Sequence, residues 1–125
     1  MNKAIWRQGR RWTPATLDTT ETTALFTVEA GVRVRSMSAR VEIAEAGGAA
    51  TQTIGDGDDV DGYFTDAQLV GGTVGLKDAG GAYTNQSGGK LYLADDTIDV
   101  VHTVSMTITT KPVIYFSVTL ERDLP

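Results

Sequence analysis

The sequence predicts an all-β protein: an antiparallel β-sandwich or jelly roll with an extended N-terminal arm and at most one short helix. Three observations favour this class. Apolar and polar residues alternate with a period of two in several segments, 18 of the 125 residues are Thr, and 14 are Gly. Branched Thr side chains disfavour helix, and Gly marks turns. A chain of this length supports one hydrophobic core. We therefore expect an arm at residues 1–14 followed by a single sandwich domain at residues 15–125.

The first half of the domain contains four strand candidates. An apolar segment at 25–28 follows a Thr-rich stretch, and residues 32–35 and 37–43 each alternate between apolar and polar side chains. The apolar phase changes from even to odd numbers between these two segments. Because such a change turns side chains to the opposite face, we expect a β-bulge or bend near Arg35 and Ser36. A short strand at 51–54 ends this half.

The second half contains one helix signal and the clearest strand signals. Residues 65–69 could start a short helix with Thr65 as its cap, and a small strand is expected at 73–76 between Gly-Gly pairs. Apolar residues then alternate through 98–108 and again through 114–120, with Thr110-Lys111-Pro112 between the two runs. This pattern predicts an antiparallel hairpin.

The charge is divided unevenly between the arm and the domain. The first twelve residues carry +4 and no acid, whereas the rest carries 7 basic against 16 acidic residues, or -9. Three interpretations of the arm stay open: it folds over its own domain, it docks on a neighbouring subunit, or it binds nucleic acid. The acidic domain would repel a phosphate backbone, which disfavours the third. Aromatic and Arg side chains dominate protein interfaces, so the candidate contact residues are Trp6, Arg7, Arg10, Arg11 and Trp12.

An acidic loop at residues 55–66 is the first place to consider for a metal site; Asp95, Asp96 and Asp99 form a second, weaker acidic cluster. The weak candidate ligands of the loop are Asp56, Asp58, Asp59 and Asp61, because carboxylate oxygens suit Ca²⁺. The spacing does not match an EF-hand, since Gln68 stands where a bidentate Glu is required. Asx turns in an exposed, soluble loop explain the Asp residues better than a bound cation does. We therefore expect no bound metal.

Catalytic constellations are not found in the sequence. No Cys is present, which excludes thiol nucleophiles and zinc–thiolate sites, and no phosphate-binding glycine loop occurs. His102 is the only His, and it falls in phase with the apolar residues of 98–108, as a core histidine would. No Ser lies in a nucleophile-elbow pattern. We expect a protein that is not an enzyme, uses no cofactor and does not insert into a membrane.

Two segments resemble small virion proteins of tailed bacteriophages, in particular capsid decoration or cement proteins. The first is Thr53–Phe64, and the second, after a Gly-rich loop, is Gly89–Val100. The resemblance implies a β-rich domain on the capsid surface that binds and stabilises the assembled lattice. It also implies two kinds of partner, the major capsid protein and neighbouring copies of the protein itself, which would form a homotrimer. It supplies no catalytic residues.

Two other functions stay open at this stage. A carbohydrate-binding or adhesion module on the virion would be favoured if Tyr63, Tyr83 and Tyr92 surrounded one shallow groove. A head–tail connector or tail component could share the same composition and would be distinguished by a ring of copies.

Overall fold

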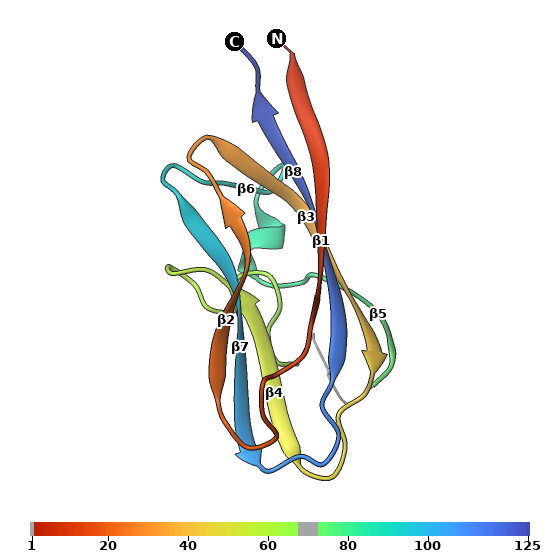
Figure 1. Ribbon diagram of the computed structural model, residues 1–125. Helices are drawn as coiled ribbons and strands as arrows, with labels where there is room; N and C mark the ends of the chain where they lie inside the picture. The colour runs from red at the N-terminus through yellow and green to blue at the C-terminus, as the bar shows by residue number, and fades with distance from the viewer. Residues whose placement is uncertain (1, 68–72) are drawn as a thin grey trace.

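The protein folds into two antiparallel β-sheets that pack face to face, as described by a computed structural model for residues 2–67 and 73–125 (Figure 1). These residues form eight strands and one 3-10 helix: β1 Lys3–Trp12, β2 Glu21–Val28, β3 Val32–Ile43, β4 Ala49–Gly55, β5 Gly75–Asp78, η1 Ala82–Asn85, β6 Lys90–Leu91, β7 Asp96–Met106 and β8 Val113–Asp123. Within the same residues, no helix reaches the length and hydropathy needed to cross a membrane. The predicted all-β sandwich class is confirmed.

The two sheets differ in size. The larger has the strand order β1-β8-β3-β5, with β6 also paired to β3, and the smaller has the order β2-β7-β4. Every pair of neighbouring strands is antiparallel. The two termini lie side by side at one end of the molecule, because β1 pairs with β8 along its whole length (Figure 1).

The core lies between the sheets and follows the period-two pattern of the sequence. Alternate residues of β3, β7 and β8 are buried, and they include Val32, Val34, Met37, Ala39, Val41, Ile98, Val100, Ile114, Phe116, Val118 and Leu120. His102 is also fully buried, as its phase predicts, and its Nδ1 lies 2.9 Å from Nε2 of Gln52. The ring of His102 meets the edge of Trp12 at a centroid distance of 5.4 Å.

The phase change in β3 is a β-bulge, as expected. The register of β3 against β8 shifts between Val34 and Ser36. The extra residue at Arg35 turns the following side chains over, so that Val34 and Met37 both face the core although three positions separate them.

The predicted hairpin is wrong. β7 pairs with β2 and β4, whereas β8 pairs with β1 and β3, so the two strands lie in different sheets. Their apolar faces meet across the core, and the connection at residues 107–112 passes from one sheet to the other. Alternation reports only that one face of a strand is buried, and this holds whether its neighbour in sequence lies beside it or opposite it.

The segment expected as a separate arm is part of the larger sheet. Ten residues, Lys3–Trp12, pair in sequence with Asp123–Ile114 of β8. Trp12 is only 4% exposed and belongs to the core. The basic segment is therefore extended, as predicted, but it folds onto its own domain as an edge strand, which was one of the open interpretations.

The short helix occupies a different place from the expected one. Asp66 and Ala67 form a turn, and the remainder of the predicted helix at 68–69 lies outside the described residues. The helix in the structure is η1, in the Gly-rich connection before β6, where no helix was predicted. The small strand predicted at 73–76 is found two residues later, as β5.

Candidate functional site: the outer face of the five-stranded sheet

The outer faces of the two sheets have different chemistry. Strand register turns ten charged residues to the outer side of the five-stranded sheet, namely Lys3, Arg7, Arg11, Arg33, Arg35, Arg40, Glu42, Asp78, Glu121 and Asp123. The outer side of β2, β7 and β4 carries mostly Thr, and Asp99 is the one charged residue among Thr22, Ala24, Thr27, Thr51, Thr53, Thr97, Asp99, Val101 and Thr103. The five-stranded sheet therefore presents the Arg-rich surface of the molecule.

Exposed apolar side chains share this face. Ile5 is 55% exposed, Leu76 64%, Leu91 39% and Tyr115 37%, and register places all four on the outer side of their strands. Arg together with exposed aromatic and aliphatic side chains is the combination found at the centres of protein–protein interfaces. The face has the composition of a contact surface.

A shallow depression, here called the central trough, lies in the middle of the face. Its floor is made of small hydroxyl side chains from β3 and β8, and its walls come from β1, β3, β5 and β8: Arg7, Ser38, Arg40, Leu76, Tyr115 and Ser117. Tyr115 packs closely over β1 at Gly9, where a Cβ would stand only 1.8 Å from the tyrosine hydroxyl. The absence of a side chain at Gly9 thus lets the tyrosine ring approach the backbone of β1.

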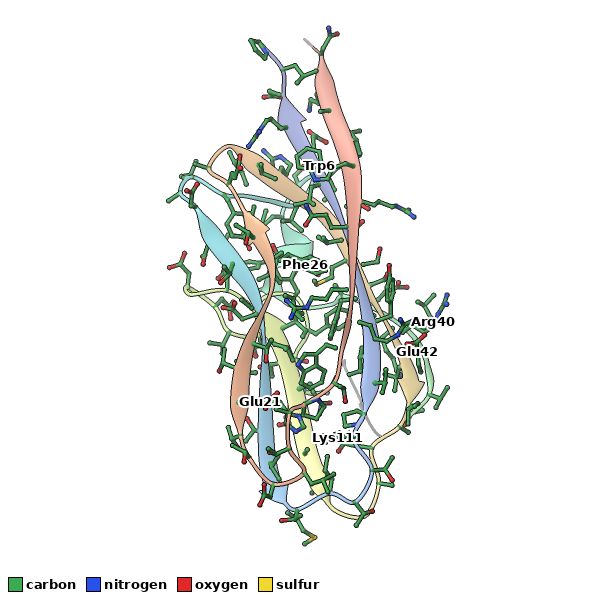
Figure 2. All side chains as sticks on the ribbon, in the orientation of Figure 1. Trp6, Glu21, Phe26, Arg40, Glu42 and Lys111 are labelled. Atoms are coloured by element: carbon green, nitrogen blue, oxygen red, sulfur yellow. The ribbon has the colours of Figure 1, made fainter. Side chains whose placement is uncertain are left out.

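The arginines on this face differ in whether they form an ion pair. Arg11 is held by Glu42, with Nε 2.6 Å from Oε1, and its hydrogen bond lowers the pKa of that carboxyl. Among the residues that the structure describes, neither Arg7 nor Arg40 forms an ion pair. Figure 2 shows Arg40 projecting from the sheet, on the side away from Phe26 in the core. Two unpaired guanidinium groups therefore flank the trough.

At the other end of the face, two cations share one carboxylate. Glu121 accepts a hydrogen bond from Lys3 at 2.7 Å and lies 3.2 Å from Nε of Arg35. The hydrogen bond from Lys3 is the main reason why the pKa of Glu121 is lowered. Both cations are thus held by a carboxylate of their own chain.

The two Trp residues proposed as contacts lie on the inner side of β1. Trp12 is buried and is not available to a partner, so this expectation is corrected: the residue packs in the core against His102. Trp6 is half-buried and lines a depression between the sheets with Val28 and Leu120 (Figure 2). Both point inward because they fall in phase with the buried residues of β8.

The three arginines of the same segment have separate roles in the structure. Arg10 donates to the backbone carbonyls of Ala24 at 2.5 Å and Leu25 at 3.4 Å, and so joins β1 to β2. Arg11 is paired with Glu42, and Arg7 alone of the three is unpaired within the described chain. The structure thus brings Arg7 together with residues that sequence reasoning did not select.

The missed residues are Arg40, Leu76 and Tyr115. The alternation in 32–35 and 37–43 already placed every Arg of β3 on the polar side, so their exposure could be read from the sequence. Their position beside Arg7 depends on the β1-β8-β3-β5 order, which no local pattern contains.

The acidic loop is organised around one buried carboxylate. The side chain of Asp56 has no exposed surface and accepts hydrogen bonds from the hydroxyls of Tyr83 and Tyr92, each at 2.7 Å, and from Nζ of Lys90 at 2.9 Å. Backbone N–H groups two and three residues later donate to the same carboxylate at 3.0 Å. The two segments that carry the phage resemblance meet here, since Asp56 comes from the first, and Lys90 and Tyr92 from the second.

This network keeps Asp56 ionised. Burial alone would raise its pKa, but the hydrogen bonds from Tyr83, Tyr92 and Lys90 outweigh burial and leave the pKa below its usual value. Burial also raises the pKa of Tyr83 to about 12, so its hydroxyl keeps the proton that it donates. The network is a buried, fully hydrogen-bonded ion pair.

The same network makes a cation site a poor fit. Carboxylates of Asp56, Asp58 and Asp96 converge within 4.8 Å, as metal ligands would. Five donors already occupy both oxygens of Asp56, and Lys90 supplies the balancing positive charge. Asp59 accepts from the N–H of Asp61 at 3.3 Å in an Asx turn.

The three tyrosines named for carbohydrate binding do cluster, but in the interior. Tyr63, Tyr83 and Tyr92 are 3%, 7% and 3% exposed and surround Asp56 rather than a surface groove. The hydroxyls of Tyr63 and Tyr92 are hydrogen-bonded at 2.8 Å, and the rings of Tyr63 and Tyr83 meet edge to face. A sugar cannot stack on rings that are buried in this way.

Comparison with solved structures finds this fold in phage capsids. A chain of the cyanophage Pam1 capsid asymmetric unit aligns with a TM-score of 0.67 and 13% identity, over 98% of this chain and 86% of that one. A chain of the acid-stable capsid of Helicobacter pylori bacteriophage KHP30 aligns with a TM-score of 0.66 and 8% identity, over 98% of both chains. No protein-family model matches the sequence, and comparison with curated proteins finds no match. The class is therefore an antiparallel β-sandwich with the fold of these phage capsid chains.

Proposed function

We propose that the protein is a structural component of a phage virion and that it binds the assembled capsid lattice from the capsid surface, as a decoration or cement protein. The observation that carries the proposal is the outer face of the five-stranded sheet, where unpaired arginines and exposed apolar side chains lie together on a fold shared with phage capsid chains. Its partners are the major capsid protein and neighbouring copies of itself.

The mechanism requires no chemical step. A protein that binds only the assembled lattice stabilises it by mass action, because its binding free energy is added to that of the subunit contacts. Many copies on a symmetric lattice gain avidity from weak individual contacts. Among the described residues, the buried position of His102 and the buried ion pair of Asp56 with Lys90 agree with a non-enzymatic role.

The contact surface centres on the trough and revises the expected set. Arg7 remains a proposed contact, joined by Arg40, Leu76 and Tyr115. Arg11 is paired within the chain and contributes at the edge of the face, whereas Arg10 points to the inner side of β1 and is no longer a proposed contact.

Cosedimentation with purified capsids of the phage that encodes the protein tests the proposal. The variant Arg7→Glu/Arg40→Glu should bind capsids with an affinity at least about tenfold lower, because it reverses two charges in one interface. The matched control Lys77→Glu/Lys111→Glu changes the net charge equally outside the trough and should bind like the unmodified protein. Point variants are required because deleting residues 1–12 would remove an edge strand and the core residue Trp12.

Undiminished capsid binding by the Arg7→Glu/Arg40→Glu variant, or equal loss in the control, would contradict the proposed surface. Absence of the protein from purified particles would contradict the virion role itself. Of the two other functions open from sequence, carbohydrate binding has lost its supporting feature because the tyrosine cluster is buried. No feature of the described residues favours a connector or tail component over a capsid position.

A further inference from the structure

A second exposed surface has the chemistry that complements the trough. The connections after β4 and before β7, together with the first residue of β7, present three carboxylates around one apolar side chain: Asp58, Leu93, Asp95 and Asp96, here called the acidic tip. Leu93 is 85% exposed, the largest exposed fraction among the large apolar residues described. Among the described residues, none of the three acids forms an ion pair. The tip thus carries unmatched negative charge and an uncovered apolar side chain.

The buried network holds this tip in place. Lys90 and Tyr92 come just before Leu93 in the chain, and both are bound to Asp56, which itself precedes Asp58. Asp95 accepts from the N–H of Ala30 at 2.8 Å, which fixes the far side of the tip to the β2–β3 turn. Because the ammonium of Lys90 is already used by Asp56, it does not neutralise the tip. A surface fixed in advance loses less conformational entropy when it binds.

Tip and trough match in both charge and polarity. The trough offers the unpaired cations Arg7 and Arg40 beside Leu76 and Tyr115, and the tip offers three unpaired carboxylates beside Leu93. Two acids near the trough reduce this contrast: Asp78 lies next to it, and Glu42, which is paired with Arg11, also feels the charge of Arg40. Within one chain the two surfaces are apart: the β6–β7 connection lies at the upper left of Figure 1, and β5 lies at the lower right. Contact between them therefore requires two molecules.

We propose that the acidic tip of one copy docks in the central trough of a second copy. Opposite charges align the two surfaces, and Leu93 covers the apolar part of the trough formed by Leu76 and Tyr115. Each molecule carries both surfaces, so the contact can be made reciprocally in a two-fold dimer or repeated around a ring. The inference deepens the proposed function by assigning the surfaces used between neighbouring copies, and it rests on that function only for the setting in which the contact occurs.

Sedimentation velocity of the isolated protein at low and high salt tests this contact without capsids. The unmodified protein should self-associate at low salt and dissociate as salt screens the charges. The trough variant is Arg7→Glu/Arg40→Glu, and the tip variant is Asp58→Arg/Asp96→Arg. The self-association constant of each should be at least about tenfold lower than that of the unmodified protein. Mixing the two variants should restore assembly, because the acidic trough of one then meets the basic tip of the other. Circular dichroism confirms that each variant is folded.

Several results would overturn the inference. The unmodified protein could stay monomeric at low salt, or the tip variant could associate as well as the unmodified protein. The mixture of the trough and tip variants could also remain monomeric. The control Lys77→Glu/Lys111→Glu should associate normally and should not assemble preferentially with the tip variant. If the trough variant loses capsid binding while the unmodified protein stays monomeric in isolation, the self-contact fails and the proposed function stands. If assembly is restored in the mixture but no variant affects capsid binding, the self-contact stands and the proposed capsid-binding surface fails.

Discussion

Lys90 is the residue whose removal should most clearly reveal the role of the buried network. The substitution Lys90→Met keeps an unbranched side chain that is one atom shorter, and it removes the charge 2.9 Å from Asp56, whose side chain has no exposed surface. It also removes a cation that lies 3.8 Å from the ring centroid of Tyr83 and 4.9 Å from that of Tyr92. Leaving one buried charge without its partner costs about 3–5 kcal/mol. For a domain of this size, that loss corresponds to a fall in Tm of about 12–20 °C.

Urea unfolding followed by circular dichroism measures the change in the free energy of unfolding. The control Lys77→Met removes an equal charge from β5, where no ion pair is described, and should change stability by about 0.5 kcal/mol or less. The double variant Asp56→Asn/Lys90→Met should recover part of the loss, because the unpaired charge is gone. A loss below about 1 kcal/mol for Lys90→Met, or a double variant as unstable as the sum of the single ones, would refute the reasoning.

Two further predictions concern His102 and a pair of glycines. Burial lowers the pKa of His102, with Glu21 and Glu45 opposing part of the effect. Protonation of His102 therefore favours the unfolded chain. Its contribution to the free energy of unfolding should be constant above about pH 6.5 and should fall by up to about 1.4 kcal/mol between pH 7.5 and 5.5. Urea unfolding of His102→Gln at both pH values should show a smaller fall, and equal falls would contradict the assignment. Gly31 and Gly89 both have positive φ, of 87° and 96°, but only at Gly89 would a Cβ meet a backbone oxygen, at 2.0 Å. Gly89→Ala should therefore cost about 1–3 kcal/mol more than Gly31→Ala in the same assay, and equal costs would show that the loop relaxes freely.

Much of the fold could be read from local patterns, with one instructive failure. The phase change in β3 predicted the bulge because side-chain direction alternates strictly with residue number. The same rule could not assign β7 and β8 to different sheets, since a buried face looks alike in sequence whether the neighbouring strand lies beside it or across the core.

The candidate site was only partly predictable for a related reason. Composition drew attention to the basic N-terminal segment, and Arg7 remains in the proposed contact surface. Trp12 was misplaced because a strand with ten residues has two sides, and the side that is buried is set by its pairing with β8. The acidic loop was recognised as distinctive, but Tyr83, Lys90 and Asp56 are brought together by contacts across 27 and 34 residues of chain.

The sequence by itself determined the all-β sandwich class, the absence of Cys and the position of the one His on the buried side of a strand, because period-two alternation and residue chemistry are local properties. Tertiary structure alone decided which arginines stand together, which tyrosines are buried, and where unmatched charge is exposed. Those features depend on strand order and on which charges find partners inside the chain, and both are set by contacts between residues distant in sequence.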